Sequence, residues 1–209
     1  MSQPQIDSSS DRRTQILDAA LGCFAKRGFH QASMHDIAAE AGISVGLIYR
    51  YFENKEAVIS AMADQHKKEI SEVLQRARQA PTLLESVEIL FTAHCCENEP
   101  RVISAFVVDL YAEASRNPRV ADLVRDVLQT AMDGLTDLIA RAPEAQAAAH
   151  GLSPTELAEL IYAVARGMLM LDVLRPQQMT AAERRERQLE VTRRLWSLLF
   201  KSENEPAYA

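Results

Sequence analysis

The sequence predicts an all-α protein of about nine helices, on the basis of three observations. Apolar residues recur at intervals of three and four residues along almost the whole chain, which is the spacing of one helix face. No segment alternates β-branched and polar residues over the length of a strand, and no Asn-Gly or Asp-Gly pair marks a hairpin. Glycine, proline and capping residues fall between the periodic segments, where helices end and begin. With 209 residues and 47% hydrophobic content, the chain can bury a sizeable core.

The first part of the chain predicts three short helices followed by a long one. Gly28 closes the first helix as a C-cap, Ser33 caps the second with Asp36 three residues later, and Ser44 opens the third. Asn54 starts the long helix. The predicted spans are residues 11–27, 34–41, about eight residues after position 44, and 54 to about 78.

After Pro81 the predicted helices are longer and more apolar. They span residues 82–98, 101–116, 118–141, 154–174 and 180–201. Ser153 and Glu156 form a predicted capping box, with Pro154 at the first helical position, and an Ala-rich loop precedes them at residues 142–153.

Composition excludes several classes of protein. The N-terminus has no apolar core typical of a signal peptide, and no run of 18 apolar residues predicts a membrane span, so a cytoplasmic protein is expected. The chain lacks a Gly-rich phosphate loop, a Gly-x-Ser-x-Gly elbow and a His-Glu-x-x-His motif, so no enzyme and no cofactor are predicted. The net charge of -6 gives no overall basic surface, and any contact with nucleic acid must be local.

Residues 34–53 satisfy the constraints of a helix-turn-helix. Ala38 is small enough for two helices to approach closely, Gly42 suits the left-handed conformation of the turn, and Ile48 fills the space between the helices. The turn Gly42-Ile43-Ser44 is three residues long, as expected of this motif.

The sequence RRTQILDAALGCFAKRGFHQASMHDIAAEAGISVGLIYRYFENKEAVI, residues 12–59, resembles the DNA-binding domain of the TetR family of transcriptional regulators. The later run DLYAEASRNPRVADLV is similar to the sixth and seventh helices of AcrR-like and BetI-like members. The resemblance implies a helix-turn-helix domain at residues 1–54 and a helical ligand-binding and dimerisation domain at residues 55–209. It also implies a homodimer that places its third helices in successive major grooves of a palindromic, double-stranded DNA operator.

Carried over by position, the resemblance implies a set of DNA-contacting residues. The groove-facing residues would be Ser44, Val45, Gly46, Tyr49, Arg50 and Tyr51, with Ser33 and Lys55 on phosphate and His35 close to the DNA backbone. Two positions depart from the family pattern, because many members have a polar residue where this chain has Val45 and Thr where it has Ala32. Tyr51 also belongs to the buried stripe, so groove contact and core packing both remain open for it.

In the family, a small-molecule effector usually binds inside the second domain. The residues suited to line such a cavity are Phe91, His94, Cys95, Phe106, Asp109, Leu110, Glu113, Met132, Tyr162, Met168 and Met170. Plain core packing is the alternative for each of them, because an apolar stripe at helical spacing is more often core.

Two groups of polar residues allow more than one interpretation. Asp109 and Glu113 share a helix face and are paired, with Arg166 as one candidate partner, exposed to solvent, or reserved for a cationic ligand. The run His94-Cys95-Cys96 invites metal or thiol sensing, but no further ligands stand at metal-site spacing and adjacent cysteines on a helix do not reach disulfide geometry. No metal is therefore predicted.

The last two long helices predict a four-helix dimer interface, with packing inside one chain as the alternative. The interface candidates are Leu157, Leu160, Ile161, Val164, Gly167, Met168 and Leu171 on one helix, and Leu189, Leu195, Trp196, Leu199 and Phe200 on the other.

Taken together, these features predict a ligand-responsive repressor that a small molecule releases from its operator. The alternative is a helical small-molecule-binding or interaction protein without DNA binding, which the net acidity and the apolar Val45 favour.

Overall fold

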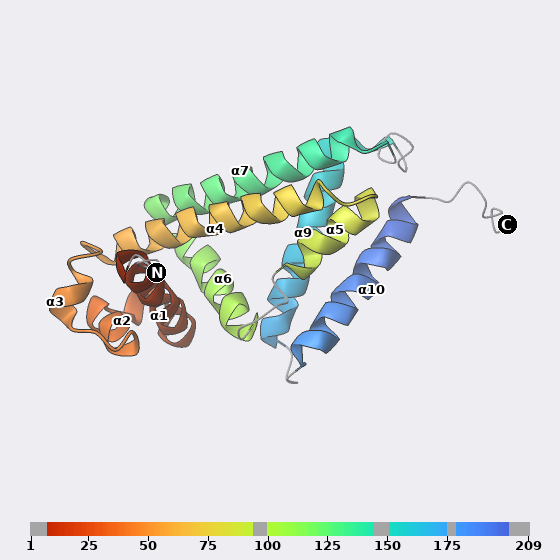
Figure 1. The fold of residues 1–209 in the computed structure, drawn as a ribbon. Coiled ribbons are helices and arrows are strands. Elements are labelled where there is room, and N and C mark those ends of the chain that lie inside the picture. Colours follow the sequence, from red (N-terminus) through yellow and green to blue (C-terminus); the bar gives the residue numbers. More distant parts are fainter. Residues whose placement is uncertain (1–7, 94–99, 144–150, 175–178, 201–209) are drawn as a thin grey trace, which may run out of the picture. The chain divides into compact units, whose positions relative to one another are not determined.

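The computed structural model describes residues 8–93, 100–143, 151–174 and 179–200 (Figure 1). Their helices are α1 (Ser8–Gln31), α2 (Met34–Glu40), α3 (Val45–Ile48), α4 (Lys55–Ala77), α5 (Leu83–Thr92), α6 (Pro100–Ala114), α7 (Pro118–Arg141), α9 (Pro154–Leu174) and α10 (Ala181–Leu199). No strand occurs in these ranges, which confirms the predicted all-α class. None of the described helices is long and apolar enough to cross a membrane.

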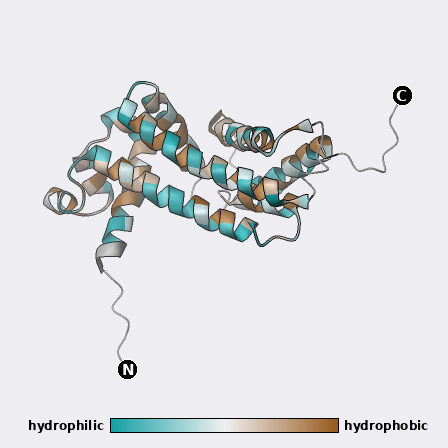
Figure 2. Ribbon diagram, turned by 90° about the horizontal axis from the view of Figure 1, so that it is seen from above, coloured by the Kyte–Doolittle hydropathy of each residue, from teal (hydrophilic) through white to brown (hydrophobic). Residues whose placement is uncertain are grey.

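The chain packs as two compact units. The first consists of Met1–His66 and Arg101–Val127, and the second of Lys67–Pro100 and Leu128–Ala209. The long helices α4 and α7 each contribute to both units, and they carry hydrophilic and hydrophobic residues along their length (Figure 2). The domain boundary expected after residue 54 stays a prediction.

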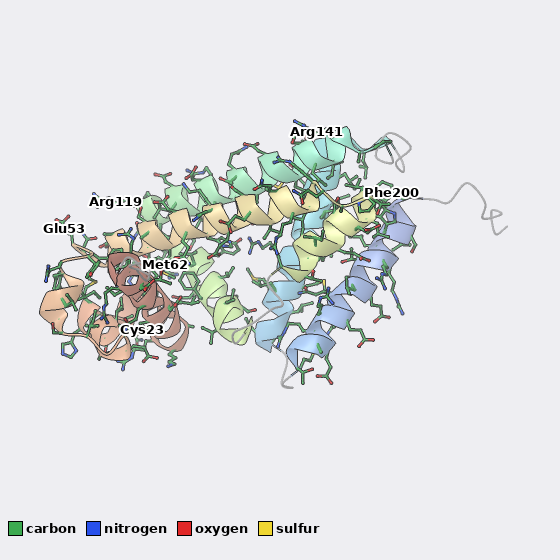
Figure 3. All side chains as sticks on the ribbon, viewed as in Figure 1. Cys23, Glu53, Met62, Arg119, Arg141 and Phe200 are labelled. Carbon is green, nitrogen blue, oxygen red and sulfur yellow. The ribbon has the colours of Figure 1, made fainter. Side chains whose placement is uncertain are left out.

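The core of the first unit holds the helix-turn-helix together. Ile16, Phe24, Ile37, Ile48 and Val58 are completely buried in one cluster that joins α1 to α4. Cys23 on α1 and Met62 on α4, both labelled in Figure 3, belong to the same packing. Burying each large side chain contributes about 1.5–3 kcal/mol, so this cluster fixes how α3 is held against α1 and α2.

Glycines set the two sharp turns of this unit. Gly28 has φ +76°, which ends the regular part of α1 as the sequence predicts, and Gly42 has φ +65° directly after α2. The N–H of Gly42 donates to the carbonyl of Ala39, and the N–H of Ile43 donates to that of Ala38. This pair of bonds is a Schellman motif, and it directs the chain from α2 into α3.

The third helix is shorter than predicted. Regular α-helix covers only Val45–Ile48, rather than about eight residues. Arg50 and Tyr51 donate their N–H groups to the carbonyls three residues earlier, Leu47 and Ile48, so the helix tightens into 3₁₀-type turns before Phe52. The segment still turns in the same sense, which keeps its buried and exposed sides distinct.

The second unit has its own core, in which α5 packs against α10. The buried residues there include Leu83, Val87, Leu138, Ile139 and Ile161. The helix starts predicted near residues 82, 154 and 180 are confirmed, with capping by Thr82, Ser153 and Thr180.

Candidate functional sites

The segment from Ser44 to Phe52 has one buried and one exposed side. Ile48 and Phe52 are 0% and 3% exposed, whereas Tyr49 is 54% exposed although it is aromatic. Arg50 is also exposed, and its guanidinium forms no hydrogen bond or ion pair within the described part of the chain. Figure 3 labels Glu53, which directly follows this segment.

Two basic residues of the first unit, Lys26 and Arg27, are paired with acids. The ammonium of Lys26 lies 2.7 Å from the Glu40 carboxylate, and the guanidinium of Arg27 lies 2.9 Å from that of Asp36. The exposed guanidinium of Arg50 therefore differs from theirs, because it keeps all its donors for a partner outside the chain.

Both predicted contact serines are helix caps. The Ser44 hydroxyl accepts the N–H of Leu47 at 3.2 Å, which leaves its own hydrogen to donate. The Ser33 hydroxyl instead donates to the Asp36 carboxylate at 2.6 Å and accepts the Asp36 N–H at 3.2 Å. This hydroxyl and the Ser33 backbone N–H hold the pKa of Asp36 below its usual value.

Lys55 closes the end of α1. Its ammonium donates to the carbonyls of Phe29 and Ala32, and it lies 4.3 Å from the centre of the Phe29 ring. Burial lowers the pKa of Lys55, although Glu56 and Glu113 act in the opposite direction. The lysine therefore has a structural role that sequence reasoning missed, and its phosphate contact stays a prediction.

The remaining predicted contact residues occupy varied surroundings. His35 and Gly46 are exposed, and a Cβ added at Gly46 would meet no atom within 4 Å. Val45 and Tyr51 are half-buried and pack against the core of the first unit. Groove contact by Val45, Gly46 and Tyr51, and the place of His35 close to the DNA backbone, stay predictions.

Four residues predicted for the effector cavity lie in the first unit. Phe106 stacks on Phe24 with ring centroids 6.1 Å apart, and Leu110 packs against the same core. Asp109 accepts the N–H of Phe29 at 2.6 Å. The left-handed turn at Gly28 exposes this N–H, and Asp109 therefore ties α6 to the end of α1.

Glu113 is the second acid of the pair and is only 2% exposed. Its Oε2 lies 2.6 Å from His30 Nε2, and its Oε1 accepts from the Asn117 amide at 3.1 Å. The two acids are paired structurally, as one of the expected interpretations had it, but their partners are the end of α1, Arg116 and Asn117 instead of Arg166.

A cavity of about 110 Å³ lies in the second unit. It is lined by Ile70, Val73, Leu74, Leu90, Phe91, Ala93, Ala131, Leu135, Ile161, Tyr162, Ala165, Arg166, Met168, Leu169 and Gln188. Three of the predicted residues, Phe91, Tyr162 and Met168, are among them. Met132 packs against the second core without lining the cavity, and Met170 is half-buried outside the lining. His94 and Cys95, with Cys96, fall outside the described residues.

Arg166 is the lining residue whose role the sequence did not reveal. Its Nε donates to the Tyr162 hydroxyl at 2.8 Å, and its guanidinium carbon lies 4.9 Å from the centre of the Tyr162 ring. A lone arginine in the apolar sequence of α9 was the available signal. The small residues Ala93, Ala131 and Ala165, which leave room between helices, carried no signal in the sequence that predicted a cavity.

The predicted interface residues divide by exposure. Leu157 and Ile161 are buried inside their own chain, whereas Leu160 and Leu171 are 42% and 49% exposed. Half-buried residues are Val164, Met168, Leu189, Leu195, Trp196, Leu199 and Phe200. Gly167 is exposed, with open space around it.

No group of three or more His, Cys, Asp or Glu residues that could hold a metal occurs in the described ranges. The buried thiol of Cys23 has a raised pKa, first because of burial and then because of Glu40 and Asp36. A raised pKa leaves less of the reactive thiolate, so Cys23 behaves as a small core residue.

Comparisons with known proteins match both parts of the chain. Residues 16–62 match the family described as bacterial regulatory proteins, tetR family. Residues 87–197, more than half of the chain, match the C-terminal region of BetI-type transcriptional repressors.

Individual relatives agree with these matches. The transcriptional regulator UidR of Escherichia coli K12 is 32% identical over 133 residues, which cover 62% of this chain and 63% of UidR. The chain thus spans somewhat less than two thirds of that relative. The nicotine-responsive repressor HdnoR of Paenarthrobacter nicotinovorans is 29% identical over 143 residues, which cover 66% of this chain and 73% of HdnoR. The structure of Salmonella enterica GusR shares the fold, with a TM-score of 0.74 and 24% identity over 96% of this chain and all of GusR.

Proposed function

The chain belongs to the TetR family of bacterial regulatory proteins, as residues 12–59 predicted, and we propose that it is a ligand-responsive transcriptional repressor. It binds a palindromic operator as a homodimer and is released when a small molecule occupies the second unit. The protein acts by binding DNA and ligand and does not catalyse a reaction. It works in the cytoplasm. One observation carries this proposal: Tyr49 and Arg50 are exposed on a segment whose opposite side buries Ile48 and Phe52.

The exposed side of α3 suits the major groove of DNA. A guanidinium recognises guanine through two hydrogen bonds, and Arg50 has no partner among the described residues that would compete. The Tyr49 hydroxyl supplies a donor for phosphate, and the Ser44 hydroxyl supplies a further donor on the groove side. Val45 and Gly46 offer only apolar contact, so thymine methyls and groove shape contribute the rest of the specificity.

The homodimer is supported by a stripe on α9. Leu160, Ala163, Gly167, Leu171 and Leu174 are all exposed and follow one another at intervals of three and four residues. Such a stripe forms one face of a helix, and a face of small and apolar residues is suited to a second copy of the same helix.

The effector is a small molecule held in the cavity of the second unit. The relative HdnoR is described as nicotine-responsive, which gives a precedent for control by a small organic ligand. The mostly apolar lining of the cavity is typical of such sites.

A footprint on the promoter region of the protein's own gene tests the proposal. We expect protection of a palindrome at moderate salt, with affinity that falls as salt rises. Arg50→Gln should weaken operator binding by about 1–3 kcal/mol and relax base preference at one position of each half-site. Arg185→Gln removes the same charge from an exposed position of α10 and should leave binding unchanged.

The role of Lys55 needs a stability measurement beside the footprint. Lys55→Ala should weaken binding to all DNA sequences alike, as expected of a phosphate contact. The same substitution removes the hydrogen bonds of Lys55 to the carbonyls at the end of α1. The melting temperature of the Lys55→Ala variant is therefore compared with that of the wild type, to separate loss of DNA contact from loss of stability.

The alternative function is ligand binding without DNA, which the net charge of -6 favours. A selection from random DNA sequences distinguishes the two. Recovery of no sequence by a protein that binds its ligand tightly would support the alternative and reject the repressor.

A further inference from the structure

The polar part of the cavity in the second unit is positively charged. Arg166 is the one ionised side chain among the described residues that line it, and it is half-buried. No carboxylate in the described part of the chain pairs with Arg166. A partly buried cation without a counter-ion is unfavourable, and an anionic ligand would offset that penalty.

Tyr162 holds the guanidinium in place for such a ligand. The Tyr162 hydroxyl accepts the Nε–H at 2.8 Å, and the ring packs against the guanidinium plane at 4.9 Å. Arginine has five N–H donors, so the two terminal nitrogens keep four of them. A planar carboxylate accepts two parallel hydrogen bonds from a guanidinium, which makes it the best-matched anion.

The rest of the cavity limits the size of the ligand. A volume of about 110 Å³ is below the roughly 300–1,000 Å³ of sites for drug-sized molecules, and closer to a cavity of about 150 Å³ that holds benzene. Apart from Arg166, Tyr162 and Gln188, the described lining residues are apolar, and they include Phe91, Leu135 and Met168. The ligand body is therefore compact and apolar.

We propose that the effector is a small monocarboxylate with an apolar body about the size of one aromatic ring, bound by Arg166 and Tyr162. This inference rests on the proposed function, in that it assigns the ligand class of the effector cavity. It differs from the cation-binding interpretation of Asp109 and Glu113, because both acids already have partners on α1 or α6–α7.

A calorimetric titration of the full chain without DNA tests the ligand class. The probes are benzoate, its neutral counterpart benzamide and its cationic counterpart benzylamine, which share one ring. We expect benzoate to bind at least about tenfold more tightly than benzamide, and benzylamine to bind most weakly. Equal binding of all three, or preference for benzylamine, would overturn the proposal.

Variants locate the site within the protein. Arg166→Gln should lower benzoate affinity about tenfold or more while benzamide affinity stays the same, because only the charge-assisted contact is lost. Tyr162→Phe should reduce benzoate affinity less, by about three- to tenfold, because the guanidinium keeps its charge but loses its support. Arg185→Gln is the matched control, and a loss of benzoate affinity in this variant as large as in Arg166→Gln would reject the site. Circular dichroism of each variant, compared with the wild type, tests whether the variant is folded.

The operator assay separates this inference from the proposed function. If the protein protects an operator but benzoate neither binds nor releases it, the ligand class is wrong and the repressor stands. If benzoate binds through Arg166 but no operator is found, the repressor is wrong and the ligand class stands.

Discussion

At the residue scale, two glycines of the helix-turn-helix differ chiefly in one backbone angle. Gly42 has φ +65°, and Gly46 lies in α3 with ordinary helical angles; a Cβ at either would meet no atom within 4 Å. Gly42→Ala should therefore destabilise the protein by about 1–2 kcal/mol through backbone strain. Gly46→Ala should stabilise it by up to about 1 kcal/mol through helix propensity.

Thermal unfolding of the two variants measures both effects. Because the added atom is the same and the space is open at both positions, a shift of the melting temperature in the same direction would contradict the assignment to backbone angle. Gly46→Ala should also weaken operator binding despite its higher stability, because its new methyl group stands on the proposed groove side.

The cap of α2 predicts a dependence of stability on pH. Ser33 holds the pKa of Asp36 below its ordinary value of 3.8 in the folded protein. The ionised carboxylate therefore stabilises the fold above the unfolded pKa, and this contribution is lost as pH falls through the lower, folded pKa.

Urea unfolding between about pH 7 and pH 2.5 measures this contribution. At neutral pH, the free energy of unfolding of Asp36→Asn should be lower than that of the wild type by a constant amount. This difference in free energy should narrow in acid, below the ordinary pKa of Asp36. A gap that persists unchanged to the lowest pH would show that the carboxylate's ionisation contributes nothing.

At the element scale, α4 and α7 approach closely in the second unit. A Cβ built on Gly134 would lie 2.1 Å from Cδ1 of Leu74, which is only 5% exposed. Overpacking costs about 1–3 kcal/mol, and the gain in helix propensity is about 1 kcal/mol at most, so Gly134→Ala should be destabilising overall. Urea unfolding of this variant and of the wild type measures the difference in their free energies of unfolding.

A double-mutant cycle with Leu74→Ala identifies the cause. Leu74→Ala alone should destabilise the protein by about 2–5 kcal/mol, but Gly134→Ala made in that background should be stabilising, because the clash is gone. Additive effects of the two substitutions would exclude steric conflict between α4 and α7.

Local signals explain why so many elements were predicted correctly. The start of α2 at Ser33, the end of the regular part of α1 at Gly28 and the start of α9 at Pro154 all depend on hydrogen bonds within a few residues. The length of α3 was overestimated, because its last turn tightens where Phe52 enters the core.

Contacts between distant parts of the chain were beyond the sequence. Asp109 lies 80 residues from its partner Phe29, and no periodicity links the two. Lys55 was assigned to DNA by position alone, whereas its carbonyl partners depend on how α1 ends. The cavity around Arg166 likewise arises from small residues on several helices, which a single helical stripe does not reveal.

At the scale of the whole molecule, function as proposed depends on two copies. The exposed stripe of α9 would be unfavourable in water and would become buried in a dimer. Leu171 is 49% exposed in a single chain, so Leu171→Glu should leave each chain folded but separate the dimer. Sedimentation should then show a monomer, and operator affinity should fall sharply, because each copy reads only one half-site.

The control for this variant is Leu128→Glu, which introduces the same charge at a leucine that is 37% exposed on α7. It should remain dimeric and bind the operator as the wild type does. A dimer that survives Leu171→Glu with unchanged affinity would place the interface elsewhere. Loss of the dimer in both variants would point to general destabilisation, which circular dichroism would reveal. Only selective loss in Leu171→Glu assigns the stripe of α9 to the contact between copies.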